Sequence, residues 1–263
     1  LSLSYGGKGA GGNIEIVNQG LLQIRASGQI SSATMGSGNA ADLKVTTAKL
    51  EIDGEAISTG INSISSGAGQ AGNLHVVVSD DALLKNYGGV SSSSFGTGKA
   101  GEIHFSARNL TIDGKGLGGG IYSDSGDFRT AANFAGGDAG SINLAIQDSL
   151  KLSDSGRISS TTYTRGKSGQ ILVQAGQLVL QGAGSGVFAE TIGQGDAGAI
   201  QVFASQRIDL LQGAQISSST RFAGKGGRVL IQTNDLNLSG PGSAILSEAS
   251  SGAQQDAGAI EIQ

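Results

Sequence analysis

Several residue types are scarce in this chain of 263 residues, and each scarcity excludes a class of protein. There is no cysteine, so disulfide bonds do not hold the fold together. Proline occurs once, and the 46 glycines do not recur at every third position, which excludes collagen. Only 14% of the residues are charged, and the scattered lysines and arginines form no basic stripe for nucleic acid. No apolar run approaches the length of a membrane-spanning helix, so we expect no membrane span.

Hydrophobic residues make up 38% of the chain and occur in short runs that alternate with polar residues, such as "GNIEIV" (12–17) and "LVLQG" (178–182). Alternation with a period of two is typical of half-buried β-strands. It also argues against general disorder, because a disordered chain lacks a recurring apolar face.

A dipeptide of two small residues recurs before these alternating strands and divides the chain into repeats. The pairs are Gly11-Gly12, Ala40-Ala41, Ala71-Gly72, Ala100-Gly101, Ala139-Gly140, Ser168-Gly169, Ala197-Gly198, Gly226-Gly227 and Ala257-Gly258. Their spacings are 29, 31, 29, 39, 29, 29, 29 and 31 residues, which gives eight units and the start of a ninth. Because one unit cannot bury an apolar side alone, we expect the units to stack on one another.

The predicted fold is all-β: a right-handed parallel β-helix of about eight coils of 29–31 residues, with three short strands in each coil. The second strand follows the first by eight residues in odd coils and by seven in even coils, so the true period is two coils. Residues 1–263 form one β-helical segment, and an insertion at 125–138 lengthens the fourth coil.

Stacking places equivalent residues in ladders along the axis. One predicted ladder points inward from the third strand and is almost all serine, which suits hydroxyl groups that bond to one another from coil to coil. Its members are Ser32, Ser66, Ser92, Ser123, Ser160, Ala189, Ser218 and Ser247. A second predicted ladder precedes the small-residue pair and alternates in charge from the third coil on: Lys99, Asp138, Lys167, Asp196, Lys225 and Asp256.

The outward face of the third strand is the candidate binding face. It carries Phe95, Tyr122, Asp124, Tyr163, Phe188 and Glu190, and exposed rings beside carboxylates suit sugar rings or a partner protein. These side chains alternatively serve only to stack or to cover a loop. The inserted loop, with Phe128, Arg129, Asn133 and Phe134, is a second candidate for recognition.

Other motifs are weaker. "GKSG" lacks the spacing and the following helix of a phosphate-binding loop, and "GQGDAGAI" does not repeat as a calcium-binding nonapeptide would. His75 and His104 occupy the same outward position in adjacent coils, but two histidines without further ligands indicate a surface ladder and not a metal site. We expect no cofactor and no metal.

The phrases "GTGKAGEIHFSARNLTIDG" (96–114) and "SGRISSTTYTRGKSGQILV" (155–173) resemble the repeats of filamentous-haemagglutinin-like large exoproteins of Gram-negative bacteria and cyanobacteria. The resemblance extends over essentially the whole chain. It implies a two-partner-secretion adhesin with a β-helical shaft, located outside the cell or on its surface and exported through an outer-membrane transporter. It implies no catalytic residues.

Three functions follow from these observations as hypotheses. The first is a structural shaft of an adhesin or filament without catalysis, which contacts flanking coils of a longer protein or copies stacked end to end, and presents surfaces to extracellular polysaccharide or to a cell. The second is a carbohydrate-binding module that uses the third-strand face. The third is a polysaccharide-active enzyme, since Asp124 and Glu190 lie two coils apart, about 10 Å at the spacing of strands.

Overall fold

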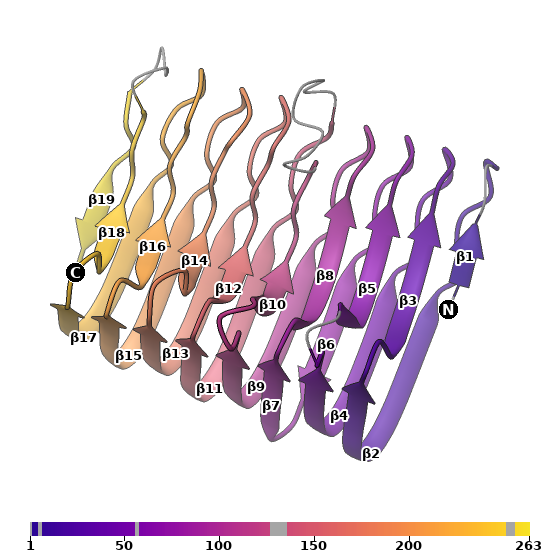
Figure 1. Ribbon diagram of the computed structural model, residues 1–263, viewed down its shortest axis with the longest axis horizontal. Helices are drawn as coiled ribbons and strands as arrows, with labels where there is room; N and C mark the ends of the chain where they lie inside the picture. Colours follow the sequence, from indigo (N-terminus) through magenta and orange to yellow (C-terminus); the bar gives the residue numbers. More distant parts are fainter. Residues whose placement is uncertain (1, 5–6, 56–57, 127–135, 251–255) are drawn as a thin grey trace.

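The computed structural model is an all-β solenoid of parallel strands, and it describes residues 2–4, 7–55, 58–126, 136–250 and 256–263. Figure 1 shows the coils side by side in one row from the N-terminal to the C-terminal end. Two sheets run the length of the row. Each strand pairs in parallel with its equivalent in the next coil, as the repeat predicts.

The larger sheet contains ten strands and forms the long side of each coil. They are β2 (Ile14–Arg25), β4 (Leu43–Asp53), β6 (Leu74–Val78), β7 (Asp81–Lys85), β9 (Ile103–Asp113), β11 (Ile142–Ser153), β13 (Ile171–Gln181), β15 (Ile200–Leu211), β17 (Val229–Ser239) and β19 (Ile260–Ile262). The predicted first and second strands are therefore one long bent strand in most coils, and they separate only at β6 and β7.

The bend coincides with a shift of register, for example between Ile146 and Ser149 of β11 against β9. The two-coil period is visible there. The long strands β2, β11 and β15 have 12 residues, whereas β4, β9, β13 and β17 have 11. The extra residue of the odd coils is accommodated at the bend as a bulge, which leaves the apolar residues on both sides of it in register.

The second sheet contains the nine third strands. They are β1 (Ser2–Ser4), β3 (Gln29–Thr34), β5 (Thr59–Ser65), β8 (Gly88–Ser94), β10 (Gly119–Tyr122), β12 (Gly156–Ser159), β14 (Gly186–Phe188), β16 (Gln215–Ser217) and β18 (Ala244–Leu246). Inward side chains of both sheets form one core, in which Ile142, Leu150 and Ile158 are fully buried.

Register corrects the serine ladder in the second coil. Ile61, and not Ile64, stands opposite Ile30, so Ser63 pairs with Ser32 and with Ser92. Ser63 is buried, whereas Ser66 is exposed and does not belong to the ladder. The sequence "INSIS" (61–65) has two isoleucines three residues apart, and the prediction of Ser66 is wrong because Ile61, two residues before Ser63, is the inward anchor.

The serine hydroxyls do not bond to one another as expected. Four serines of the ladder, Ser63, Ser92, Ser123 and Ser160, instead each join two successive small-residue turns, and Ser160 shows the pattern. Its Oγ accepts a hydrogen bond from the N–H of Gly169 at 2.9 Å and donates one to the carbonyl of Gly140 at 2.8 Å, one coil earlier. Ser92 and Ser123 make the same pair of bonds. The serine ladder therefore connects the third strand to the small-residue turns by hydrogen bonds.

The charge ladder contains ion pairs in the described coils. Lys99 Nζ lies 2.8 Å from Asp138 Oδ2, and Lys167 Nζ lies 3.2 Å from Asp196 Oδ2. The other carboxylate oxygen of each aspartate accepts the backbone N–H of the next coil, that of Lys167 at 3.0 Å and that of Lys225 at 3.1 Å. Each aspartate thus connects three coils.

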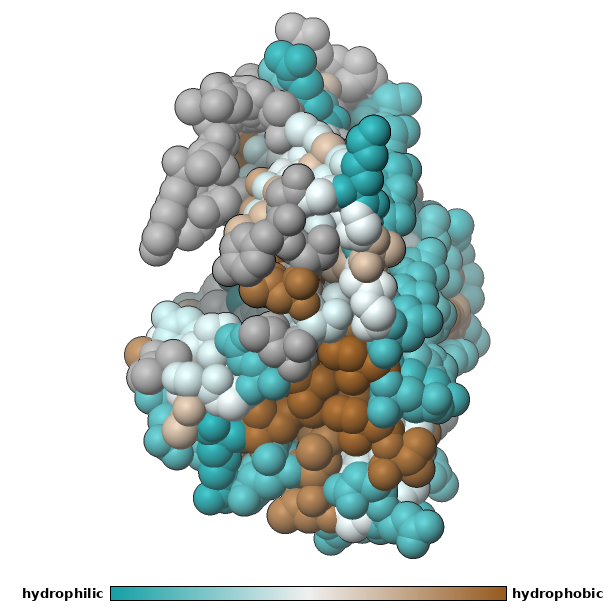
Figure 2. All heavy atoms as spheres, turned by 90° about the vertical axis from the view of Figure 1, so that its right-hand side faces the viewer, coloured by the Kyte–Doolittle hydropathy of each residue, from teal (hydrophilic) through white to brown (hydrophobic). Residues whose placement is uncertain are grey.

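Apolar side chains of the first coil are not fully covered. Figure 2 views the end of the stack near β2 and shows them gathered there. Ile14, Ile16 and Leu22 are only partly buried, although they pack against the core. In the last coils, Leu238, Ile260 and Ile262 are 43%, 44% and 53% exposed.

Candidate functional site

A groove of about 700 Å³ interrupts the third-strand face between β5 and β12, and we call it the third-strand groove. Its lining comes from three parts of successive coils: the outward side of the third strands, the residues that follow these strands, and the turns that precede them. The groove therefore runs along the solenoid axis over several coils.

Glycine creates the hollow. The outward position just before the apolar anchor is Gly60, Gly89 and Gly120 in three successive coils and then Arg157. These glycines place no side chain in the space above the sheet. A side chain at Gly120 is also excluded sterically, because its φ is +152° and a Cβ would lie 1.8 Å from the carbonyl oxygen of Arg157.

Long turns form one wall of the groove. In coil 3 the third-strand anchor Val90 follows Leu84, the last inward residue of the long strand, by six positions, but in coil 4 Ile121 follows Ile112 by nine. The longer turn brings Gly116–Gly119 into the lining, and Leu117 protrudes with 46% exposure. Tyr87, in the shorter turn of coil 3, is 45% exposed beside it.

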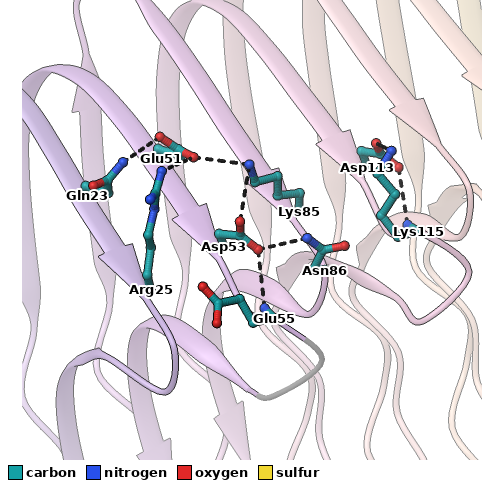
Figure 3. A network of polar contacts seen from close by, with 9 residues as sticks. All are labelled: Gln23, Arg25, Glu51, Asp53, Glu55, Lys85, Asn86, Asp113 and Lys115. Atoms are coloured by element: carbon teal, nitrogen blue, oxygen red, sulfur yellow. Dashed lines mark hydrogen bonds and ion pairs between the residues drawn. The ribbon is translucent and has the colours of Figure 1, made fainter.

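A network of charges braces the strand ends from which these turns leave (Figure 3). Lys85 Nζ lies 3.2 Å from both Glu51 and Asp53, and Asn86 donates to Asp53 at 2.8 Å. Hydrogen bonds to Glu51 and then to Asp53 raise the pKa of Lys85. Burial favours a higher pKa for Asp53, but the bonds from Asn86 and Lys85 outweigh it and lower that pKa. The turn that carries Tyr87 is therefore held in place.

The opposite wall contains rings from the strand ends. Phe95 is 50% exposed, and Tyr163 occupies the equivalent position two coils later. Outside the terminal coils, the exposed large hydrophobic residues of the described chain are Tyr87, Phe95, Leu117 and Phe222. The first three of these line this one groove, which makes it the principal apolar surface away from the ends.

Asp124 is the acidic group of the groove. Its Oδ1 accepts the N–H of Thr161 at 2.7 Å and the hydroxyl of Ser159 at 2.8 Å. Its Oδ2 has no hydrogen-bond partner in the described part of the chain. Burial raises the pKa of Asp124 to about 6, and the two hydrogen bonds and nearby Arg157 only partly oppose this effect. The carboxyl group therefore titrates in mildly acidic solution.

Arg157 is the basic group, and it lies between two aromatic residues on neighbouring coils. Its guanidinium carbon is 4.1 Å from the ring centroid of Phe188. Tyr122, on the other side, folds back along its strand so that its hydroxyl accepts the N–H of Gly119 at 3.3 Å. Burial raises the pKa of Tyr122 to about 12, so its hydroxyl stays protonated. Arg157 forms no ion pair within the described ranges.

The structure brings four of the predicted face residues together and separates two. Phe95, Tyr122, Asp124 and Tyr163 line the groove. Phe188 was expected to face solvent but is only 5% exposed, because its ring folds over Gly186 beneath Arg157. Glu190 is not part of the lining, and its Oε1 accepts the hydroxyl of Ser217 at 2.6 Å. Phe128, Arg129, Asn133 and Phe134 lie outside the described residues.

The sequence did not identify Tyr87, Leu117 or Arg157 as groove residues, nor the column of Gly60, Gly89 and Gly120. A usable signal was present in "TGI", "GGV" and "GGI" (59–61, 88–90 and 119–121), where glycine precedes the inward anchor in three successive coils. The predicted ladder member Ser66 lies three residues beyond Ser63, and this shift conceals the alignment of Gly60 with Gly89.

Two other surface features offer fewer charged or reactive side chains than the groove. A hollow of about 730 Å³ follows the bend of the larger sheet, and its lining of Gln174, Phe203, Gln232 and neighbours contains no charged side chain. His75 and His104 are paired in register, with ring centroids 6.1 Å apart. No group of three or more His, Cys, Asp or Glu residues in the described ranges is arranged to hold a metal ion.

Within the same ranges, no helix has the length and hydrophobicity needed to cross a bilayer. Comparison of the chain with protein-family models, with curated proteins and with solved structures finds no match in any of the three.

Proposed function

We propose that this chain is a segment of an extracellular or cell-surface shaft whose third-strand groove binds a carbohydrate chain. The observation that carries the proposal is the concentration of exposed Tyr87, Phe95 and Leu117 around a groove that also holds Asp124 and Arg157. Apolar rings pack against the C–H faces of sugars, and a few polar groups fix their orientation. A groove parallel to the axis suits an extended polymer.

The shaft role is supported by the continuous core and by the coil-to-coil ladders, which make the solenoid a rigid support. Apolar residues of the first and last coils are partly exposed, and flanking coils or copies stacked end to end would cover them. Membership of the two-partner-secretion adhesins, and with it a secretion partner in the outer membrane, belongs to the proposal through the resemblance of the repeats.

The proposed role involves no catalysis. An inverting glycosidase needs two carboxyl groups that face each other across the scissile bond. Asp124 bonds to residues of the following coil, and Glu190 likewise bonds onward to Ser217, so each carboxyl group is fixed to its own neighbour. Glu190 also lies outside the groove lining.

Binding of the intact chain to an array of neutral and acidic oligosaccharides tests this proposal. We expect binding to at least one class of oligosaccharide, and at least a tenfold loss of affinity in a Phe95→Ala, Tyr163→Ala double variant. Phe222→Ala is the matched control, because Phe222 is an exposed ring (46%) outside the groove and its removal should leave the affinity unchanged. Absence of binding to any oligosaccharide, or equal loss in the control, would contradict a carbohydrate site here.

A further inference from the structure

The chemistry of the groove narrows the class of carbohydrate, provided that the proposed function holds. The charged side chains of its described lining are one carboxylate, Asp124, and one guanidinium, Arg157. Their formal charges cancel when both are ionised. The described lining of the groove therefore offers no net positive field that would select an acidic polysaccharide.

Two groups of the described lining have unused hydrogen-bonding capacity: the carboxylate of Asp124, an acceptor, and the guanidinium of Arg157, a donor. Asp124 lines the groove, and both of its hydrogen bonds reach Oδ1, so within the described residues Oδ2 remains available to a ligand. An ionised carboxylate can only accept hydrogen bonds, and the natural complement is a ligand rich in hydroxyl donors. The guanidinium of Arg157 stacks on Phe188, and its buried Nε has no hydrogen-bond partner within the described residues. Hydroxyl groups both donate and accept, so they complement Asp124 and Arg157 together.

Within the described residues, few charged and titratable groups surround Asp124. Arg157 approaches from β12, Tyr122 lies on its own coil, and Tyr163 follows β12. On the side of coil 3 the neighbouring residue in the stack is the uncharged Ser93. Ionisation of the carboxyl group in this site is thus decided by its poor solvation, by the hydrogen bonds from Thr161 and Ser159, by Arg157 and by any ligand group that donates a hydrogen bond to Oδ2.

We propose that Asp124 recognises hydroxyl groups of an uncharged sugar through Oδ2. A hydroxyl that donates to Oδ2 stabilises the ionised form and lowers the pKa of Asp124 from about 6. Linkage is reciprocal, so protonation of Asp124 weakens binding by the same factor. Affinity for a neutral sugar accordingly falls as the pH falls, and affinity for an acidic sugar would rise.

Calorimetry on the intact chain tests this inference with two probes. The neutral probe is a glucose hexasaccharide or, where the array shows no binding of it, the most similar neutral oligosaccharide that binds. The acidic probe is a galacturonate hexamer. Between pH 8 and pH 5 we expect the affinity for the neutral probe to fall about tenfold, because about one Asp124 in ten is ionised one pH unit below a pKa of about 6. Titrations near pH 6 in two buffers of different ionisation enthalpy should show release of about half a proton per bound ligand.

Asp124→Asn should remove both the pH dependence and the proton release, and lower the affinity at pH 8 at least tenfold. The amide oxygen can still accept the bonds from Thr161 and Ser159, so the variant should fold. Glu190→Gln is the matched control on the same face, because Glu190 does not line the groove. It should behave as the unaltered chain does.

The outcomes separate the two proposals. Loss of binding in the Phe95→Ala, Tyr163→Ala variant together with unchanged binding in Asp124→Asn would overturn this inference and leave the carbohydrate site standing. Tighter binding of the galacturonate hexamer at pH 5 than at pH 8 would overturn it as well, in favour of an acidic ligand. Absence of binding by every oligosaccharide would remove both proposals.

Discussion

At the scale of single residues, the buried serines have a defined structural role. Ser160 satisfies one backbone donor and one backbone acceptor that are both enclosed by the solenoid. The same column contains one natural exception, Ala189, at which the N–H of Gly198 instead bonds to the carbonyl of Ala189 at 3.1 Å. The column therefore permits a missing hydroxyl once.

We predict that Ser160→Ala lowers the free energy of unfolding by about 1–3 kcal/mol, since it leaves the carbonyl of Gly140 without its donor. Urea unfolding followed by circular dichroism measures the change. Ser205→Ala, at an exposed serine, should stay within about 0.5 kcal/mol. An equal response of the two variants would show that the hydroxyl of Ser160 contributes nothing.

Asp124 should make stability depend on pH in an unusual direction. Its pKa of about 6 lies above the ordinary value of 3.8, so the folded chain holds this proton where the unfolded chain has lost it. Its contribution is therefore most favourable below about pH 4 and declines as the pH rises to about 6. A carboxyl group that costs stability at neutral pH fits a residue kept for binding.

We predict that Asp124→Asn stabilises the chain at pH 7 by up to about 3 kcal/mol, relative to its effect at pH 4. Urea unfolding at the two pH values gives this difference. Glu248→Gln, at an exposed acid in the same column of the stack, should have no such effect. An NMR titration that places the Asp124 carboxyl near its ordinary pKa would refute the prediction.

At the scale of elements, the sequence predicted most of what stacking alone determines. The repeat of about 29 residues predicts parallel pairing, and the alternation of charge in the Lys/Asp column matches the ion pairs at Lys99 and Lys167. The period of two coils appears as the alternating lengths of the long strands. These features follow from register, which a repeated sequence shows directly.

The groove was only partly predictable, for physical reasons. Period-two alternation predicts that Phe188 points outward, but it does not predict that its ring folds over Gly186 and becomes covered by Arg157. Solvation of Asp124 likewise depends on turns whose paths are set by insertions such as Gly116–Gly119. Exposure of an outward residue in a solenoid depends on the neighbouring coils.

The charge ladder gives a prediction at this scale. Lys167→Asp would place three carboxylates on successive coils, so we expect a lower urea midpoint and a larger effect at low salt. Lys167→Ala should change the free energy of unfolding by less than about 1 kcal/mol. A salt-independent effect of Lys167→Asp would show that the ladder does not act through charge.

The pH dependence of the ladder is opposite to that of Asp124. Backbone hydrogen bonding from Lys225 and the pairing with Lys167 together lower the pKa of Asp196. At Asp138 burial is the largest single influence and favours a higher pKa, but the bond from Lys99, the backbone bond from Lys167 and the charges of both lysines together outweigh it and lower the pKa. The stabilisation is therefore complete above the ordinary aspartate pKa of about 4 and is lost as the pH falls through the lower folded values.

At the scale of the whole molecule, stability is a sum over neighbouring coils. Coils in the middle bury their anchors completely, whereas Ile14 and Ile16 at one end and Leu236 at the other are only partly buried. We predict that amide hydrogen exchange is at least about tenfold slower in β9, β11 and β13 than in β2 and β17. Uniform protection from β2 to β17 would contradict independent fraying of the outer coils.

The central claim is that successive coils bring Phe95, Asp124 and Tyr163 to one groove that holds a sugar chain. A crystal structure of the chain with the bound oligosaccharide tests it most directly. We predict a sugar hydroxyl about 2.5–3.0 Å from Asp124 Oδ2, with sugar rings against Phe95 and Tyr163. A sugar bound on another face, or a stack in which Asp124 does not meet Thr161, would contradict the claim.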